Sequence, residues 1–149
     1  MRNRIDELFS SCRGGVLGLI GFGTFGRRIR EIALSHGMTV LVCDPAKERE
    51  QSEEEYQDIL EQWGNGMGGC GTVREDPVVF LPLDALLRRA DWIAAAVPLN
   101  RETEGMIDRS FLSKRKPGSR ILNFSDPRIA SADVADSPFL LQIDDFPAQ

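Results

Sequence analysis

The chain carries three glycines at a spacing that only a few folds need. Gly21, Gly23 and Gly26 form the pattern G-x-G-x-x-G directly after an apolar run at residues 16–20. That run does not alternate between polar and apolar residues, which is typical of a strand buried on both faces of a parallel sheet. Apolar residues then recur at helical spacing over residues 25–35, which predicts an amphipathic helix. A strand, a glycine turn and a helix in this order predict the opening of a Rossmann dinucleotide-binding domain.

Each glycine of the pattern has its own physical reason. Gly21 is expected to make the tight turn out of the strand, Gly23 to leave no side chain in the way of a pyrophosphate, and Gly26 to let the helix lie close against the sheet. A helix N-terminus at Thr24 and Phe25 offers backbone N–H groups and a partial positive charge to the phosphates. These five residues are therefore candidate cofactor-binding residues.

An acidic residue, Asp44, closes a second predicted strand at residues 39–43. It follows the glycine turn at about the separation at which a carboxylate reaches the adenosine ribose hydroxyls of a dinucleotide. Its negative charge disfavours a 2′-phosphate, so we expect the cofactor to be NAD. The alternatives are that Lys47 and Arg49 accommodate the extra phosphate of NADP, or that the glycines serve only a tight turn.

Strands and helices alternate along the rest of the 149-residue chain, which is long enough for one domain. A glycine-rich segment at 64–76 is interpreted as a loop insertion. Alternation of this kind predicts an α/β fold with a doubly wound parallel sheet in a single domain, 1–149. The further expected elements are an N-terminal helix within 1–12, helices over 46–63, 83–89 and 108–112, and strands over 78–81, 92–97, 120–124 and 139–143.

Composition argues against several classes of partner. The net charge of −5 is unfavourable for polyanions, and basic residues do not cluster with aromatic ones, so no nucleic-acid partner is expected. No run approaches the roughly 18 apolar residues of a membrane span, and the first residues carry no apolar signal, so we expect a cytoplasmic protein without membrane contact. Three well-separated cysteines and one histidine do not suggest a metal site.

Further motifs follow the glycine turn in a fixed order. They include L-D-A-L-L at 83–87, A-D-W-I at 90–93, V-P-L-N at 97–100, M-I-D at 106–108, K-P-G at 116–118 and I-L-N at 121–123. In this order the segments resemble the nucleotide-binding domain of the D-2-hydroxyacid dehydrogenases. The resemblance covers nearly the whole chain except residues 46–71.

The resemblance implies additional contacts with the cofactor. The main chain near Val97 and Pro98 would pass the adenosine side of NAD, and the strand that ends at Asn123 would lie by the nicotinamide. Asp144 resembles an aspartate that approaches the nicotinamide amide. Family members commonly pair through this domain, so the resemblance also implies a homodimer, for which an apolar N-terminal stripe that includes Phe9 is a candidate contact.

The catalytic groups of the family are where the resemblance ends. The position of the family's substrate-binding arginine holds Asp126, whose charge would repel a 2-keto or 2-hydroxy acid. Arg128 is a candidate substitute. The family's histidine and substrate domain have no match in this chain, and His36 is interpreted as a surface residue at a helix end. We therefore assign no catalytic residue.

The sequence leaves more than one function open. The leading hypothesis is an NAD-binding domain related to 2-hydroxyacid oxidoreductases and not catalytically competent as an isolated chain, either a fragment of a longer enzyme or a degenerate protein. The alternative is a non-catalytic structural or regulatory Rossmann module that dimerises or binds a protein partner. A methyltransferase that binds S-adenosylmethionine uses a similar glycine turn, but the succession of motifs up to Asn123 argues against it.

Overall fold

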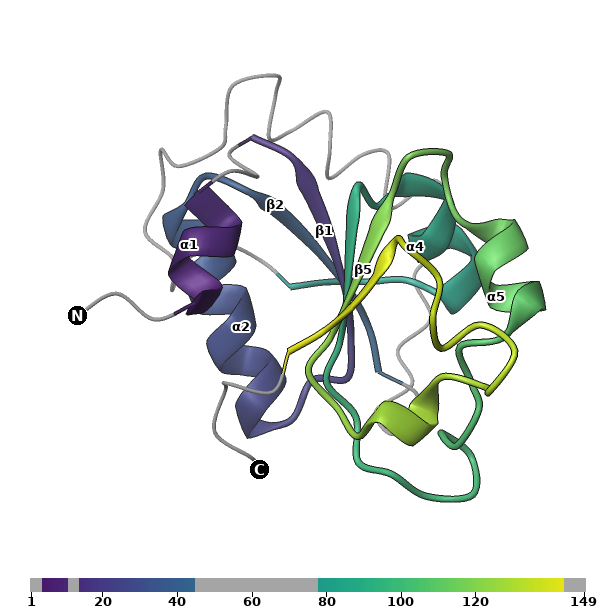
Figure 1. Ribbon diagram of the computed structural model, residues 1–149. Helices are drawn as coiled ribbons and strands as arrows, with labels where there is room; N and C mark the ends of the chain where they lie inside the picture. Colours follow the sequence, from purple (N-terminus) through teal and green to yellow (C-terminus); the bar gives the residue numbers. More distant parts are fainter. Residues whose placement is uncertain (1–3, 11–13, 45–77, 144–149) are drawn as a thin grey trace.

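The computed structural model describes residues 4–10, 14–44 and 78–143 (Figure 1). They form a six-stranded sheet in the order β3-β2-β1-β4-β5-β6, with every neighbouring pair parallel. The doubly wound α/β prediction is therefore confirmed. The elements are α1 (Arg4–Ser10), β1 (Val16–Ile20), α2 (Thr24–Ser35), β2 (Thr39–Cys43), β3 (Val79–Phe80), α4 (Leu83–Arg89), β4 (Trp92–Ala95), α5 (Arg109–Lys114), β5 (Arg120–Asn123), the 3₁₀ turn η2 (Pro127–Ile129) and β6 (Leu140–Gln142).

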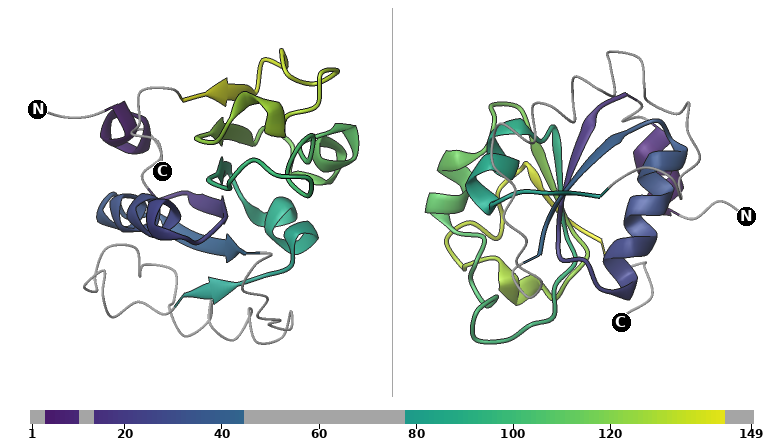
Figure 2. Two further views of the ribbon diagram at one scale, coloured as in Figure 1. Left: turned by 90° about the horizontal axis from the view of Figure 1, so that it is seen from below. Right: turned by 180° about the vertical axis from the view of Figure 1, so that it is seen from behind.

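Helices cover both faces of the sheet, which explains the unbroken apolar character of β1. α1 and α2 lie on one face, and α4 and α5 lie on the other; Figure 2 shows the same layers from behind. Leu17 and Leu19 of β1 pack with Ile29 of α2, whereas Ile20 packs with Leu86 of α4 on the opposite face. All five side chains are fully buried, and each contributes about 1.5–3 kcal/mol through burial.

The N-terminal helix α1 lies within the predicted range 1–12 and packs against α2. Phe9 is fully buried in the same cluster as Ile29 and Ala33, with its ring edge-on to that of His36 at 6.5 Å between centroids. Phe9 therefore belongs to this chain's own core, although the sequence suggested it for a dimer contact. His36 is half-buried beside it.

Several predicted boundaries shift for reasons that the hydrogen bonds explain. β4 ends at Ala95 rather than at residue 97, because the N–H of Val97 donates to the side chain of Ser125 instead of to a neighbouring strand. The helix predicted over 108–112 begins one residue later, because the carboxylate of Asp108 caps it by accepting from Phe111 N–H at 2.9 Å. The predicted helix at 46–63 and loop at 64–76 lie outside the described residues.

One short element was not predicted. Residues Pro127–Ile129 form η2, in which Asp126 is the N-cap and Pro127 takes the first position. Proline suits that position because its missing N–H would have no partner there. Among the described helices, none is both long and apolar enough to cross a membrane.

Candidate functional site

The glycine turn lies at the carboxyl end of β1, between β2 and β4. In this strand order the chain connections diverge at β1 and β4, which is where ligands bind in sheets of this type. Gly21 N–H donates to the carbonyl of Cys43 at the end of β2 (2.8 Å). Gly21 has a φ of 99°, and a Cβ atom there would lie 2.2 Å from the carbonyl oxygen of Ala96. The fold itself therefore requires glycine at this position.

Gly23 is different, because neither its backbone conformation nor the described residues around it exclude a side chain. It is the N-cap of α2, with φ of −81° and ψ of −162°, a backbone conformation open to any residue. A Cβ atom added there would meet no atom of the described residues within 4 Å. By contrast, a Cβ atom on Gly26 would lie 2.4 Å from the carbonyl oxygen of Gly21, so Gly26 lets α2 approach the turn. The open space at Gly23 fits a ligand that must come close to the backbone.

The first turn of α2 is suited to an anion. Backbone N–H groups at a helix N-terminus have no partner within the helix, and they carry a partial positive charge. The N-cap residue Gly23 has no side chain that could cap α2, and the first turn of α2 contains no acidic residue. Thr24 is exposed at the first helical position, whereas the side chain of Phe25 is buried, so any contact that Phe25 makes with a ligand is through its backbone. The residues present therefore fit a pyrophosphate.

Asp44 directly follows β2, beside the glycine turn. It is half-buried, and the residue before it, Cys43, accepts the hydrogen bond from Gly21 N–H. Burial, with a contribution from the negative charge of Asp44, raises the pKa of the Cys43 thiol to about 11. Cys43 therefore remains a neutral thiol at pH 7, and Asp44 is the acidic group at this end of β2.

The ends of β4 and β5 are joined by Ser125, which the sequence did not single out. Its hydroxyl accepts from Val97 N–H (2.8 Å) and donates to the carbonyl of Ala95 (3.1 Å). Ala96 N–H in turn donates to the carbonyl of Ile20 on β1 (2.8 Å). These bonds hold Val97 beside the glycine turn, with Pro98 exposed next to it.

Polar side chains fix the loop that follows Pro98. The Thr103 hydroxyl donates to the carbonyl of Pro98 (2.6 Å) and accepts from Asn100 N–H (2.8 Å). The side-chain oxygen of Asn100 accepts from Thr103 N–H (3.0 Å). The position of Pro98 is therefore set by the chain itself before any ligand binds.

Asn123 is buried at the end of β5, and its side-chain amide makes hydrogen bonds within the chain. Its nitrogen donates to the side-chain oxygen of Gln142 (2.8 Å), and its side-chain oxygen accepts from Ser125 N–H (2.9 Å). Gln142 also donates to the carbonyl of Ser125 (2.9 Å). In the described structure Asn123 thus positions the turn after β5. Asp144, the other residue expected near the nicotinamide, lies outside the described residues.

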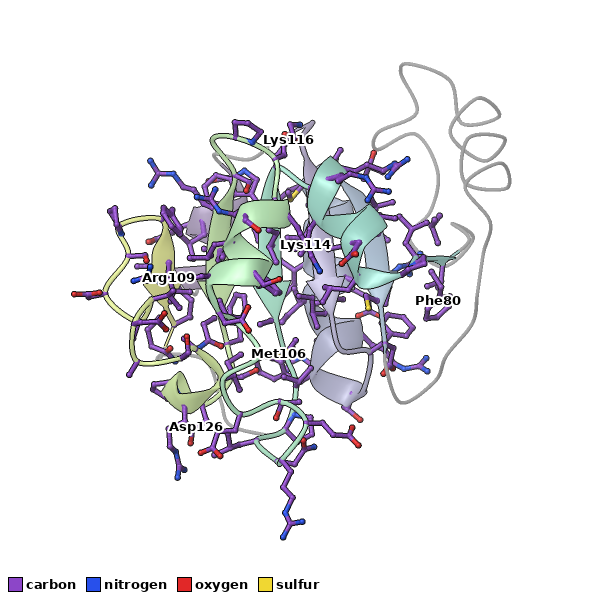
Figure 3. The ribbon with its side chains drawn as sticks, turned by 90° about the vertical axis from the view of Figure 1, so that its right-hand side faces the viewer. Phe80, Met106, Arg109, Lys114, Lys116 and Asp126 are labelled. Atoms are coloured by element: carbon purple, nitrogen blue, oxygen red, sulfur yellow. The ribbon has the colours of Figure 1, made fainter. Side chains whose placement is uncertain are left out.

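Asp126 and Arg128 form an ion pair where the resemblance places a substrate-binding arginine. The guanidinium donates from Nε to Oδ1 (3.1 Å) and from Nη2 to Oδ2 (3.0 Å) of the carboxylate. These bonds, followed by one from Arg128 N–H, lower the pKa of Asp126 to about 2. Figure 3 shows Asp126 beside η2, at the opposite end of the molecule from Lys116. Arg128, the candidate substitute for the catalytic arginine, is therefore bound to Asp126.

The structure thus brings most of the predicted site together at the carboxyl end of the sheet. The glycine turn and the first residues of α2 lie at the end of β1, with Asp44 on one side and Val97 and Pro98 on the other. Asn123 lies one strand further along, at the end of β5. The sequence missed Ser125 and Gln142, because their roles depend on strand pairings that it does not reveal.

Comparisons with known proteins agree with this geometry. The sequence profile of the family described as "D-isomer specific 2-hydroxyacid dehydrogenase, NAD binding domain" matches residues 2–64 and 70–134. A hydroxypyruvate reductase of Thermotoga maritima is 33% identical over 110 residues, which cover 74% of this chain and 28% of that protein. A D-3-phosphoglycerate dehydrogenase of Bacillus subtilis is 29% identical over 140 residues, which cover 94% of this chain and 22% of that protein. The chain thus spans less than a third of either relative.

A solved structure shares the fold. The NAD-dependent formate dehydrogenase of Staphylococcus aureus, determined in complex with NAD, superposes with a TM-score of 0.60 at 21% identity, over 82% of this chain and 30% of that one.

Proposed function

Since the chain belongs to the D-isomer specific 2-hydroxyacid dehydrogenase family through its NAD-binding domain, we propose that it binds NAD at the glycine turn. Gly23 supports this proposal most directly, because a side chain there would meet no atom of the described residues within 4 Å, and a ligand that comes close to the backbone needs that space. The N-terminus of α2, which has no acidic residue in its first turn, provides the partial positive charge that favours a pyrophosphate.

The residues around the turn have distinct parts in this proposal. The backbone from Gly21 to Gly26, including Thr24 and Phe25, holds the pyrophosphate. Asp44 accepts hydrogen bonds from the adenosine ribose, and its charge favours NAD over NADP. Val97 and Pro98 line the adenosine side, and Asn123 and Asp144 belong to the nicotinamide side. When bound, NAD supplies a hydride acceptor.

We propose further that the chain by itself does not turn over a 2-hydroxy acid. Hydride transfer to a 2-keto acid needs a cation that holds the substrate's carboxylate and polarises its carbonyl. The position that the resemblance gives to this cation holds Asp126, which its bonds with Arg128 keep ionised. A carboxylate there opposes the binding of a second carboxylate.

Calorimetric titration with NADH and NADPH tests the proposed cofactor. We expect NADH to bind and NADPH to bind more weakly, because a 2′-phosphate would lie against Asp44. Tighter binding of NADPH would refute the assignment to Asp44. If neither nucleotide binds at millimolar concentration, the chain is instead a structural or regulatory module that has kept the fold.

Two further tests concern activity and assembly. An activity screen over 2-keto acids with NADH should show no turnover, and turnover by the isolated chain would contradict the role given to Asp126.

The homodimer is proposed from the resemblance, and sedimentation velocity should show a mass of twice 16.6 kDa if it forms.

A further inference from the structure

The guanidinium of Arg27 lies against the ring of Phe22, which forms an aromatic platform beside the glycine turn. The guanidinium carbon is 4.7 Å from the centroid of the Phe22 ring, which is within the range of a cation–π interaction. Phe22 is only 5% exposed, and its ring packs edge-on against Phe80 of β3, with 5.6 Å between centroids and 88° between planes. The platform is therefore fixed by the core, while Arg27 is exposed.

This arrangement places a cation where the helix itself disfavours one. Arg27 stands in the first turns of α2, next to Arg28, and cations near a helix N-terminus are destabilising. The first turn of α2 contains no acidic residue to offset that charge. An anion at the turn would be attracted by the helix N-terminus and by the guanidinium together.

We propose that Arg27 binds the pyrophosphate of the dinucleotide and that Phe22 positions its guanidinium for this contact. This inference rests on the proposed function. Stacking on Phe22 covers one face of the guanidinium and leaves its N–H groups, which lie in the plane of the group, available to phosphate oxygens. Phe22 stands in the turn itself, between Gly21 and Gly23, so the platform holds the guanidinium beside the turn that the proposed function gives to the pyrophosphate.

The test compares two neighbouring arginines by calorimetry. Arg27→Gln and Arg28→Gln remove the same charge from the same helix, and both side chains are exposed. For Arg27→Gln we expect a loss of roughly tenfold or more in affinity for NADH and an equal loss for NADPH, since both carry the pyrophosphate. For Arg28→Gln we expect a change below about threefold. Thermal unfolding should be similar for the two variants.

Two further variants separate charge from position. Arg27→Lys keeps the charge but loses the planar group, so it should recover only part of the affinity. Phe22→Leu keeps an apolar side chain but removes the ring, and it should weaken NADH binding while Arg27 remains. Full affinity in Arg27→Lys would show that the charge alone matters and would overturn the positioning role of Phe22.

The outcomes distinguish this inference from the proposed function. If the unmodified chain does not bind NADH, the proposed function fails. If it binds and Arg27→Gln binds equally well, or if both glutamine variants lose the same affinity, only the role of Arg27 is overturned. A loss confined to NADPH would also overturn it, because the guanidinium would then contact the 2′-phosphate.

Discussion

Replacing Gly21 and Gly23 by alanine, one at a time, should separate what the fold requires from what a bound dinucleotide requires. At Gly21 the new Cβ atom would lie 2.2 Å from the carbonyl oxygen of Ala96, with φ at 99°. Backbone strain of about 1–3 kcal/mol and overpacking of about 1–3 kcal/mol together give a loss of roughly 2–6 kcal/mol in the free energy of unfolding. Gly21→Ala should therefore be severely destabilised.

Gly23→Ala should behave in the opposite way. The new methyl group meets no atom within 4 Å in the part of the chain that the structure describes, and the backbone conformation is ordinary. We expect a loss of stability of only about 0.5–1 kcal/mol, because alanine is a poorer N-cap than glycine. Affinity for NADH should fall, however, since a methyl group in the path of the pyrophosphate costs about 1–3 kcal/mol, or roughly 5- to 150-fold.

Urea denaturation and calorimetry measure the two quantities separately. The expected contrast is a loss of stability in Gly21→Ala and a loss of NADH affinity, with little loss of stability, in Gly23→Ala. A Gly23→Ala protein that binds NADH as tightly as the unmodified chain would refute it. So would a loss of stability in Gly23→Ala as large as that in Gly21→Ala.

Two further predictions concern the framework around the site. Ser125→Ala leaves the buried N–H of Val97 without its acceptor and should cost about 1–3 kcal/mol in urea denaturation. The second prediction concerns Asp91. Its burial raises the pKa of the carboxyl, but hydrogen bonds from Lys116 and from the N–H of Val16 outweigh this and hold that pKa below its usual range. The stability that this carboxylate contributes is therefore present at neutral pH and is lost as the pH falls below about 4. In Asp91→Asn the free energy of unfolding should depend less on pH in this acidic range.

Matched controls make both results decisive. Ser113→Ala removes an exposed hydroxyl that bonds only within its own helix, and it should change stability by less than about 0.5 kcal/mol. Asp84→Asn breaks an exposed ion pair with Lys114 and should lower the free energy of unfolding at neutral pH less than Asp91→Asn does. Equal effects of target and control would contradict the role assigned to Ser125 or to Asp91.

The sequence predicts those features that depend on neighbouring residues. β1, the glycine turn and α2 were predicted nearly residue by residue, because a buried strand, a glycine pattern and an amphipathic helix are all local signals. The glycine roles at 21 and 26 follow from the same pattern. Only the structure shows that the close approach of Gly26 is to the carbonyl of Gly21.

What the sequence could not predict depends on contacts between distant segments. The hydrogen bond from the Asn123 amide to Gln142 depends on the register of β5 against β6. The bridge from Ser125 to Val97 requires the pairing of β5 with β4. The burial of Phe9 depends on how α1 packs against α2. Each of these is a tertiary contact, and the adjacent sequence does not show which distant segment is the partner.

Backbone amide chemical shifts during a titration with NADH show whether a dinucleotide binds at the glycine turn. We predict the largest shifts at residues 21–26, at Asp44 and at Val97, which meet at the carboxyl end of the sheet. The amide of Ser119, which precedes β5 at the other end, should not shift. Shifts that cluster away from the glycine turn, or no shifts at millimolar NADH, would contradict binding of the dinucleotide at the turn.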